Sequence, residues 1–144
     1  MIVVADTSGI IAASDRRAAE SGGCRDVLSS AGTVIVSPLV LTEVDHLAKV
    51  RFGTRARHAI LDNIITQALR MRFQVPEVGP DTLKLAREVQ RKYADLDLDL
   101  ADAVNVTLAA DYRTDAILTL DRRYFRAIRP LTPHKAFRVL PDDL

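Results

Sequence analysis

Four acidic residues lie where a folded α/β chain rarely leaves a carboxylate without a partner: Asp6, Glu43, Asp102 and Asp121. Asp6 follows the apolar run 2–5, and Asp121 follows the apolar run 117–120. Both runs are rich in branched aliphatic residues, which is typical of strands buried on both faces. We therefore expect both aspartates at the carboxyl ends of strands, where open parallel sheets place their ligand sites.

Asp102 lies in segment 98–110, which is apolar around most of a helix circumference and is therefore predicted to pack inside the protein. A carboxylate there must be neutralised, paired or bound to a cation, because its desolvation is costly. Glu43 comes one turn after Pro38, near a predicted helix start beyond the second strand, so it can also lie above the strand ends. Asp99 shares the helix face of Asp102 and is a further candidate metal ligand.

A group of carboxylates at one place favours a hard divalent cation. Mg²⁺ and Mn²⁺ prefer oxygen ligands and are held by a few carboxylates around an open centre. Such an ion can activate water and stabilise the oxygens of a phosphoryl group, which is the chemistry of metal-dependent phosphodiester hydrolysis. The three histidines, His46, His58 and His134, lack the spacing of a zinc site. Taken singly, each acid could be only a helix cap, a surface residue or a turn.

Arginines outnumber lysines by sixteen to four, although the formal net charge is only +1. They form two clusters: Arg51, Arg55 and Arg57, then Arg122, Arg123, Arg126 and Arg129. The planar guanidinium suits phosphate because it binds in a bidentate manner. The second cluster directly follows Asp121 and is the stronger candidate for phosphate contacts. A solvated surface is the alternative explanation for both clusters.

The elements that must position these residues alternate along the chain. Strands are predicted at 2–5, 33–36, 73–75 and 117–120, with an edge strand at 137–140. Helices are predicted at 10–13 with Thr7 or Ser8 as the cap, 17–30, 38–53, 54–71, from 81 to before 95, and 98–110. Such alternation indicates a three-layer α/β/α fold with a mostly parallel central sheet. No repeat or linker interrupts the pattern, so we expect residues 1–144 to form a single domain.

Composition agrees with an ordinary globular domain. The 144 residues are 48% hydrophobic and 27% charged, and a chain of this length can bury a sizeable core without a disulfide. No apolar run reaches the length of a membrane span, and no signal peptide is visible, so a cytoplasmic location is expected. The single cysteine, Cys24, cannot form an internal disulfide, which agrees with a reducing compartment.

The ordered set of acidic motifs resembles that of PIN-domain ribonucleases. The motifs are Asp6-Thr7-Ser8 after the first strand, Glu43 in a helix begun by proline, Ala101-Asp102-Ala103 in the apolar helix, and Thr119-Leu120-Asp121-Arg122-Arg123-Tyr124-Phe125. Length and order resemble, more narrowly, the VapC-type toxins of bacterial toxin–antitoxin pairs. The resemblance extends from Ile2 to about Pro141, which is nearly the whole chain.

The resemblance implies a Mg²⁺- or Mn²⁺-dependent endoribonuclease that acts on RNA, forms a homodimer and is inhibited by a small cognate VapB-like antitoxin. The implied acidic quartet is Asp6, Glu43, Asp102 and Asp121. Asp6 and Asp102 would be the direct metal ligands. The candidate substrate contacts are Ser8, Thr119, Arg122 and Arg123. Asp99 matches no position of the family's pattern, so its role stays open.

Two other classes of protein are possible on the sequence alone. An aspartyl-phosphate hydrolase of the haloacid dehalogenase type would use Asp6 as the nucleophile, but Ser8 stands where those enzymes usually carry a second aspartate. A non-catalytic interaction module, either receiver-like or a degenerate PIN adaptor, would use the carboxylates only for a structural cation. The intact quartet argues against degeneracy, and no lysine follows Asp121 as a receiver site would require.

Overall fold

A five-stranded sheet forms the centre of the structure, a computed structural model that describes residues 1–144. Its strands are β1 (Ile2–Ala5), β2 (Thr33–Ile35), β3 (Phe73–Gln74), β4 (Ala116–Leu118) and β5 (Arg138–Leu140). They lie side by side in the order β3-β2-β1-β4-β5. Every pairing is parallel, which confirms the predicted α/β fold and extends the parallel arrangement to the whole sheet.

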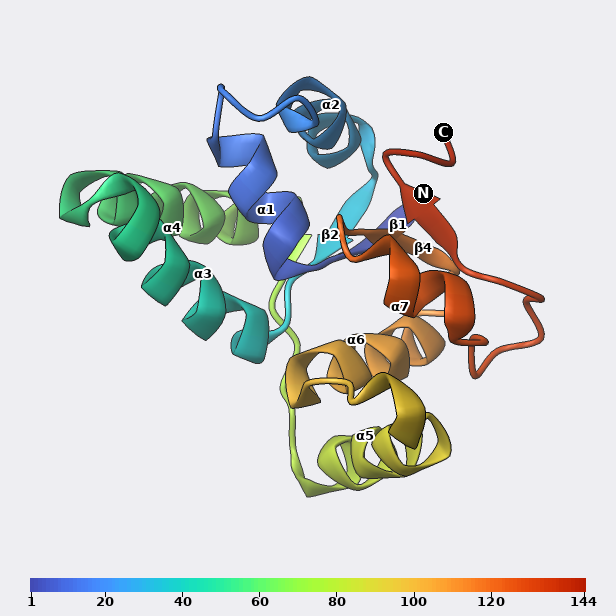
Figure 1. Ribbon diagram of the computed structural model, residues 1–144. Helices are drawn as coiled ribbons and strands as arrows, with labels where there is room; N and C mark the ends of the chain where they lie inside the picture. Colours follow the sequence, from blue (N-terminus) through green and yellow to red (C-terminus); the bar gives the residue numbers. More distant parts are fainter.

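Helices cover both faces of the sheet (Figure 1). One face carries α1 (Thr7–Ser14), α2 (Ser21–Ser30), α3 (Pro38–Phe52) and α4 (Thr54–Leu69). The other carries α5 (Pro80–Lys92), α6 (Leu100–Asp111) and α7 (Arg122–Ala127), with a short 3₁₀ turn, η1 (Ala94–Leu96), between α5 and α6. None of these helices combines the length and the apolar character needed to span a bilayer.

Alternation of side chains along the strands separates the two cores. In β1, Val3 and Ala5 pack with α1 to α4, whereas Val4 packs with α5 to α7. The neighbouring strand repeats this pattern, because Val34 faces the first group of helices and Ile35 the second. Both sets are buried, which explains why the strands read as continuous apolar runs and not as alternating ones.

The strand order creates a switch point between β1 and β4. The chain adds β2 and β3 on one side of β1, and then returns to place β4 and β5 on the other. Helices therefore leave the two central strands toward opposite faces, and the space above their carboxyl ends is open to ligands. The end of β1 is tied to the end of β4, because the Asp6 amide donates to the Leu118 carbonyl at 2.9 Å.

One helix lies unusually close to this point. A Cβ atom at Gly9 of α1 would come within 2.6 Å of Leu118 Cγ and 2.9 Å of the Leu118 carbonyl oxygen. Only a residue without a side chain allows α1 to sit so close to β4.

The single cysteine, Cys24, is buried in α2.

Several predicted boundaries were wrong. Asp6 itself is the N-cap of α1, so the prediction that Thr7 or Ser8 caps a shorter helix fails. β4 ends at Leu118, and two residues separate it from Asp121. α2 begins at Ser21 and α6 at Leu100, so Asp99 stands just outside the helix, at its N-cap. Helix α7, which directly follows Asp121, was not predicted.

Candidate metal centre

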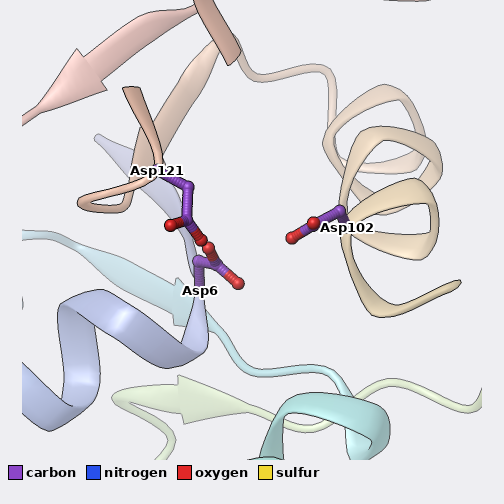
Figure 2. A group of neighbouring side chains, drawn as sticks. All are labelled: Asp6, Asp102 and Asp121. Carbon is purple, nitrogen blue, oxygen red and sulfur yellow. The ribbon is translucent and has the colours of Figure 1, made fainter. Parts of the chain in front are cut away.

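Three carboxylates from distant parts of the chain come together above the strand ends. Asp6, Asp102 and Asp121 each offer an oxygen atom, and these atoms all lie within 4.8 Å of one another. Figure 2 shows Asp6 and Asp121 beside each other at the ends of β1 and β4, with Asp102 directed toward them from α6. The structure thus gathers three of the four acids that were selected from the sequence.

Asp6 is held by a set of donors. Its side chain is only 2% exposed, and its Oδ1 accepts a hydrogen bond of 2.8 Å from the Thr7 amide at the start of α1. Oδ2 accepts from the Thr119 hydroxyl at 2.8 Å, and the Asn105 amide group lies 3.4 Å from Oδ1. The N-cap position explains the orientation, because a capping carboxylate turns back over the first turn of its helix.

Asp102 lies in the first turn of α6, a helix whose residues 101–109 are all buried. The side chain is 8% exposed. The positive end of the helix dipole favours a carboxylate at this place, but it supplies only a fraction of a charge. The apolar sequence of α6 therefore carries Asp102 into the interior and leaves its charge largely uncompensated.

The cluster disfavours three uncompensated negative charges, which either bound protons or a cation can relieve. Burial raises the pKa of Asp102 to about 8, and the charges of Asp6 and Asp121 add to the rise. Burial also raises the pKa of Asp6 to about 7, and the charge of Asp121 adds to it, whereas the hydrogen bond from Thr119 opposes it. None of these three acids forms an ion pair within the chain. An all-oxygen donor set without a counter-charge fits a hard divalent ion such as Mg²⁺ or Mn²⁺.

Glu43 stands beside this cluster on α3. That helix begins at Pro38, and the Ser37 side chain caps it by accepting from the Leu39 amide at 3.1 Å. The hydroxyl of Thr7, the residue that follows Asp6, donates to Glu43 Oε1 at 2.6 Å and so orients the Glu43 carboxylate. Glu43 therefore lines the same pocket without joining the group of three converging oxygens.

The carboxylates open into a pocket of about 420 Å³ between the two helix layers. Asp99 is exposed and lines it, so it lies within the same acidic environment although outside α6. Ser8 also lines the pocket, but its hydroxyl accepts from the Leu120 amide at 2.9 Å. Thr119 is buried behind the carboxylates and accepts from the Asp121 amide at 2.9 Å. In the structure, both hydroxyls hold the loop that carries Asp121.

A model of the PIN domain matches residues 3–130 of the chain. The chain belongs to the PIN-domain family. It is 36% identical over 140 residues to Ribonuclease VapC26 of Mycobacterium tuberculosis, which covers 96% of this chain and 100% of that protein.

Solved structures share the fold of this PIN domain. Mycobacterium tuberculosis VapC20, described as a sarcin-ricin loop cleaving toxin, superimposes with a TM-score of 0.72 at 22% identity over 83% of this chain and 89% of that one. VapBC2 from Rickettsia felis, bound to a promoter DNA fragment, gives a TM-score of 0.67 at 16% identity, over 92% and 96% of the chains. A toxin–antitoxin complex from Klebsiella pneumoniae gives 0.61 at 20% identity, over 92% and 98%.

The arginines that follow Asp121 lie outside the pocket of the PIN domain. Arg122 forms a two-point ion pair with Asp142, and its Nη2 donates to Oδ1 at 3.1 Å. Arg123 is exposed, and its guanidinium carbon lies 5.8 Å from the centre of the Tyr124 ring. Of the two arginines selected from the sequence, only Arg123 is free of an intramolecular ion pair.

Five residues of the site are outside the set selected from the sequence, although Arg51 belonged to the less favoured of the two arginine clusters: Thr7, Asp15, Arg51, Asn105 and Tyr124. Two of them were open to prediction from helical spacing. Asn105 lies three residues after Asp102 on the buried face of α6, and Arg51 lies two turns after Glu43 on α3. Tyr124 could not be placed, because α7 itself was not predicted.

Proposed function

We propose that this PIN domain is an endoribonuclease that hydrolyses RNA phosphodiesters with Mg²⁺ or Mn²⁺, and that it is the toxin of a toxin–antitoxin pair. The observation that carries the proposal is the convergence of Asp6, Asp102 and Asp121 without a cation partner. Neither histidine nor lysine lines this pocket, so neither of these two bases is available there to activate water in place of a metal ion.

The relatives support the toxin assignment. VapC26 carries the name of a ribonuclease and matches nearly the whole chain. VapC20 is described as a sarcin-ricin loop cleaving toxin, and two of the similar structures come from toxin–antitoxin assemblies. We therefore propose a protein antitoxin as the partner. A homodimer and a cytoplasmic location, both expected from the sequence, stay predictions.

In the proposed mechanism the side chains of the pocket hold the metal ion and orient the attacking water. Asp6, Asp102 and Asp121 would hold the metal ion, and two of these carboxylates must give up protons to do so. The ion, when bound, supplies Lewis acidity that lowers the pKa of water and offsets the negative charge of the phosphodiester. Glu43, fixed by the Thr7 hydroxyl, lies beside this centre and can accept a hydrogen bond from the attacking water.

The reaction forms one phosphorus–oxygen bond and breaks another. Oxygen of water attacks the phosphorus, and the proton of that water passes to a nearby carboxylate, for which Glu43 is the candidate. The bond to the leaving oxygen breaks, and that oxygen takes up a proton from solvent. Asp99 lies at the edge of the pocket, where it would add negative charge without joining the converging oxygens.

The pocket lacks the residues that an aspartyl-phosphate mechanism needs in addition to Asp6. Ser8 occupies the position two residues after Asp6, and its hydroxyl is used to hold the Leu120 amide. No lysine lines the pocket to stabilise a phosphoryl group on Asp6.

Induced expression in a bacterial host tests the proposed function. The parent chain should arrest growth and create new 5′ ends in cellular RNA, which sequencing of 5′ ends detects. The variant Asp102→Asn should do neither, because it keeps the shape of the site and loses the charge. Expression of the parent without new 5′ ends relative to this variant would contradict the proposal.

A further inference from the structure

The pocket above the strand ends contains a single cation. Six of its 15 lining residues are acids: Asp6, Asp15, Glu43, Asp99, Asp102 and Asp121. Arg51 is the only basic residue among the 15. An RNA strand that enters this pocket brings further negative charge, and Arg51 is the one lining side chain whose positive charge can hold a phosphate.

Arg51 shares a helix face with the catalytic candidate Glu43. Glu43, Leu47 and Arg51 follow one another at intervals of four residues along α3, and all three line the pocket. Eight residues advance a helix by about 12 Å, so Arg51 is displaced from the carboxylate cluster along the pocket wall. It is also exposed to solvent, which places it at the outer part of the pocket.

The guanidinium of Arg51 is not used within the chain. It forms neither a hydrogen bond nor an ion pair with another side chain, whereas Arg57 pairs with Asp45 at 3.5 Å and Arg126 pairs with Asp143 at 2.5 Å. Arg122 is likewise occupied by Asp142. Arg51 therefore keeps its donors free for an external anion and reaches the pocket that the other arginines do not line.

We propose that Arg51 binds a phosphate of the RNA strand next to the one that is cleaved. This inference rests on the proposed ribonuclease function and deepens it by assigning the residue that sets the path of the strand along α3. A planar guanidinium can grip a phosphate at two points, and its distance from Glu43 keeps it off the reacting atoms. Arg51 is thus a positioning residue and not a catalytic one.

A role at the helix end is the competing explanation. Arg51 lies in the last turn of α3, where a cation interacts favourably with the helix dipole. Lys49 lies in the same turn and is exposed, but it does not line the pocket. The variant Lys49→Ala is therefore a matched control, since it removes one charge from the same helix end.

The test compares Arg51→Ala, Arg51→Lys and Lys49→Ala with the parent, using a short single-stranded RNA that the parent cleaves. We expect Arg51→Ala to raise KM about tenfold or more with a smaller change in kcat, because a charge-assisted phosphate contact is lost. The slope of log affinity against log salt should shrink by about 0.7, the share of one phosphate on a single strand. Binding is measured in an Asp102→Asn background to prevent cleavage. Arg51→Lys should keep the slope and lose part of the affinity, and Lys49→Ala should match the parent.

Each outcome decides the assignment. A parent that cleaves RNA while Arg51→Ala keeps the parental KM and salt slope would overturn the role of Arg51 and leave the ribonuclease proposal intact. Equal losses of melting temperature in Arg51→Ala and Lys49→Ala, with unchanged RNA affinity, would assign Arg51 to the helix end and overturn it as well. A parent that neither binds nor cleaves RNA would overturn the proposed function and this inference with it.

Discussion

The hydroxyl of Thr119 donates a hydrogen bond to Asp6 Oδ2 at 2.8 Å. The hydroxyl oxygen of Thr119 in turn accepts from the Asp121 amide at 2.9 Å, so one buried hydroxyl joins the ends of β1 and β4. This bond supports the ionised form of Asp6, which burial otherwise disfavours. Thr119 thereby keeps a buried carboxylate closer to the charge state that a metal ion requires.

Replacement of Thr119 should therefore shift the pH dependence of the site. In Thr119→Val the donor to Asp6 is lost, so the pKa of Asp6 should rise further and cleavage should require a higher pH and more Mg²⁺. Stability should fall by about 1–3 kcal/mol, because the hydroxyl makes two hydrogen bonds, to Asp6 and from the Asp121 amide. The control Thr119→Ser keeps the hydroxyl and should stay close to the parent. A parental pH–rate profile in Thr119→Val would show that this bond does not tune the site.

The stability of the metal-free protein should depend on pH. The pKa values of Asp6 and Asp102 are raised from 3.8 to about 7 and about 8, so the folded state binds protons more tightly than the unfolded chain between about pH 4 and 8. Stability is then fully present below the unfolded pKa and is lost as pH rises through the folded values. Melting in chelator should consequently shift to lower temperature from pH 5 to pH 8.5.

The same measurement has internal controls. The pKa values of Asp142 and Asp143 are lowered by pairing with Arg122 and Arg126, so their contribution changes only in the acid range and leaves this window clear. Asp102→Asn should reduce the dependence of the melting temperature on pH, because it removes the carboxyl group whose pKa is raised more. A parent whose melting temperature stays level or rises over this range would contradict the uncompensated burial of the pair.

Gly9 should be sensitive to the smallest substitution. In Gly9→Ala the added methyl would meet both the side chain and the backbone of Leu118, so α1 must move away from β4 at a cost of about 1–3 kcal/mol. Nothing lies within 4 Å of the corresponding point at Gly22 in α2. Gly22→Ala should therefore be neutral or stabilising, since alanine is the better helix former. Thermal melting compares the two, and equal stability would refute the close approach at Gly9.

The two arginines after Asp121 should now behave differently. Arg123 is exposed and has no ion-pair partner, so we expect Arg123→Ala to weaken RNA binding and to lower the salt dependence of that binding. Arg122 is paired with Asp142, so Arg122→Ala should loosen the C-terminal segment and leave the salt slope unchanged. Filter binding at several salt concentrations measures both. Parental affinity and slope in both variants would make this cluster a solvated surface.

Much of the fold and the positions of the acids could be predicted, because a small number of strong local constraints determine them. Strands buried on both faces must be continuously apolar, and a polar residue directly after such a run marks the strand end, as Asp6 does. Because α6 is apolar and buried, a carboxylate in it must be neutralised, paired or bound to a cation, which marked Asp102 as a site candidate. These residues could be interpreted one at a time, from their immediate neighbours in the chain.

Residues whose role depends on tertiary contacts were harder to predict. The six residues of α7 are too few to show helical periodicity, so neither this helix nor the place of Tyr124 was found. The pairing of Arg122 with Asp142 joins positions 20 residues apart through the last turn of the chain, and no local pattern indicates it. Arg51 differs from Arg57 in lining the pocket and in lacking an ion-pair partner, and both differences depend on tertiary contacts.

The charge of Asp102 should limit stability while it supports function. Two carboxylates about 5 Å apart repel by roughly 3 kcal/mol at an effective dielectric constant near 20, unless one takes up a proton. In chelator, Asp102→Asn should therefore melt no lower than the parent. Mg²⁺ should raise the melting temperature of the parent more than that of the variant, because a ligand that binds the native state stabilises it. A variant that melts well below the parent in chelator and still cleaves RNA would make Asp102 a structural acid.

The most direct test of the account is the metal dependence of RNA cleavage by the purified protein. One preparation is treated with excess chelator, assayed on RNA, and assayed again after Mg²⁺ or Mn²⁺ is restored, with Asp102→Asn in parallel. We expect cleavage by the parent only when the divalent ion is present, and none by the variant in either condition. Undiminished cleavage by the parent in excess chelator would contradict the claim that the acidic cluster acts through a metal ion.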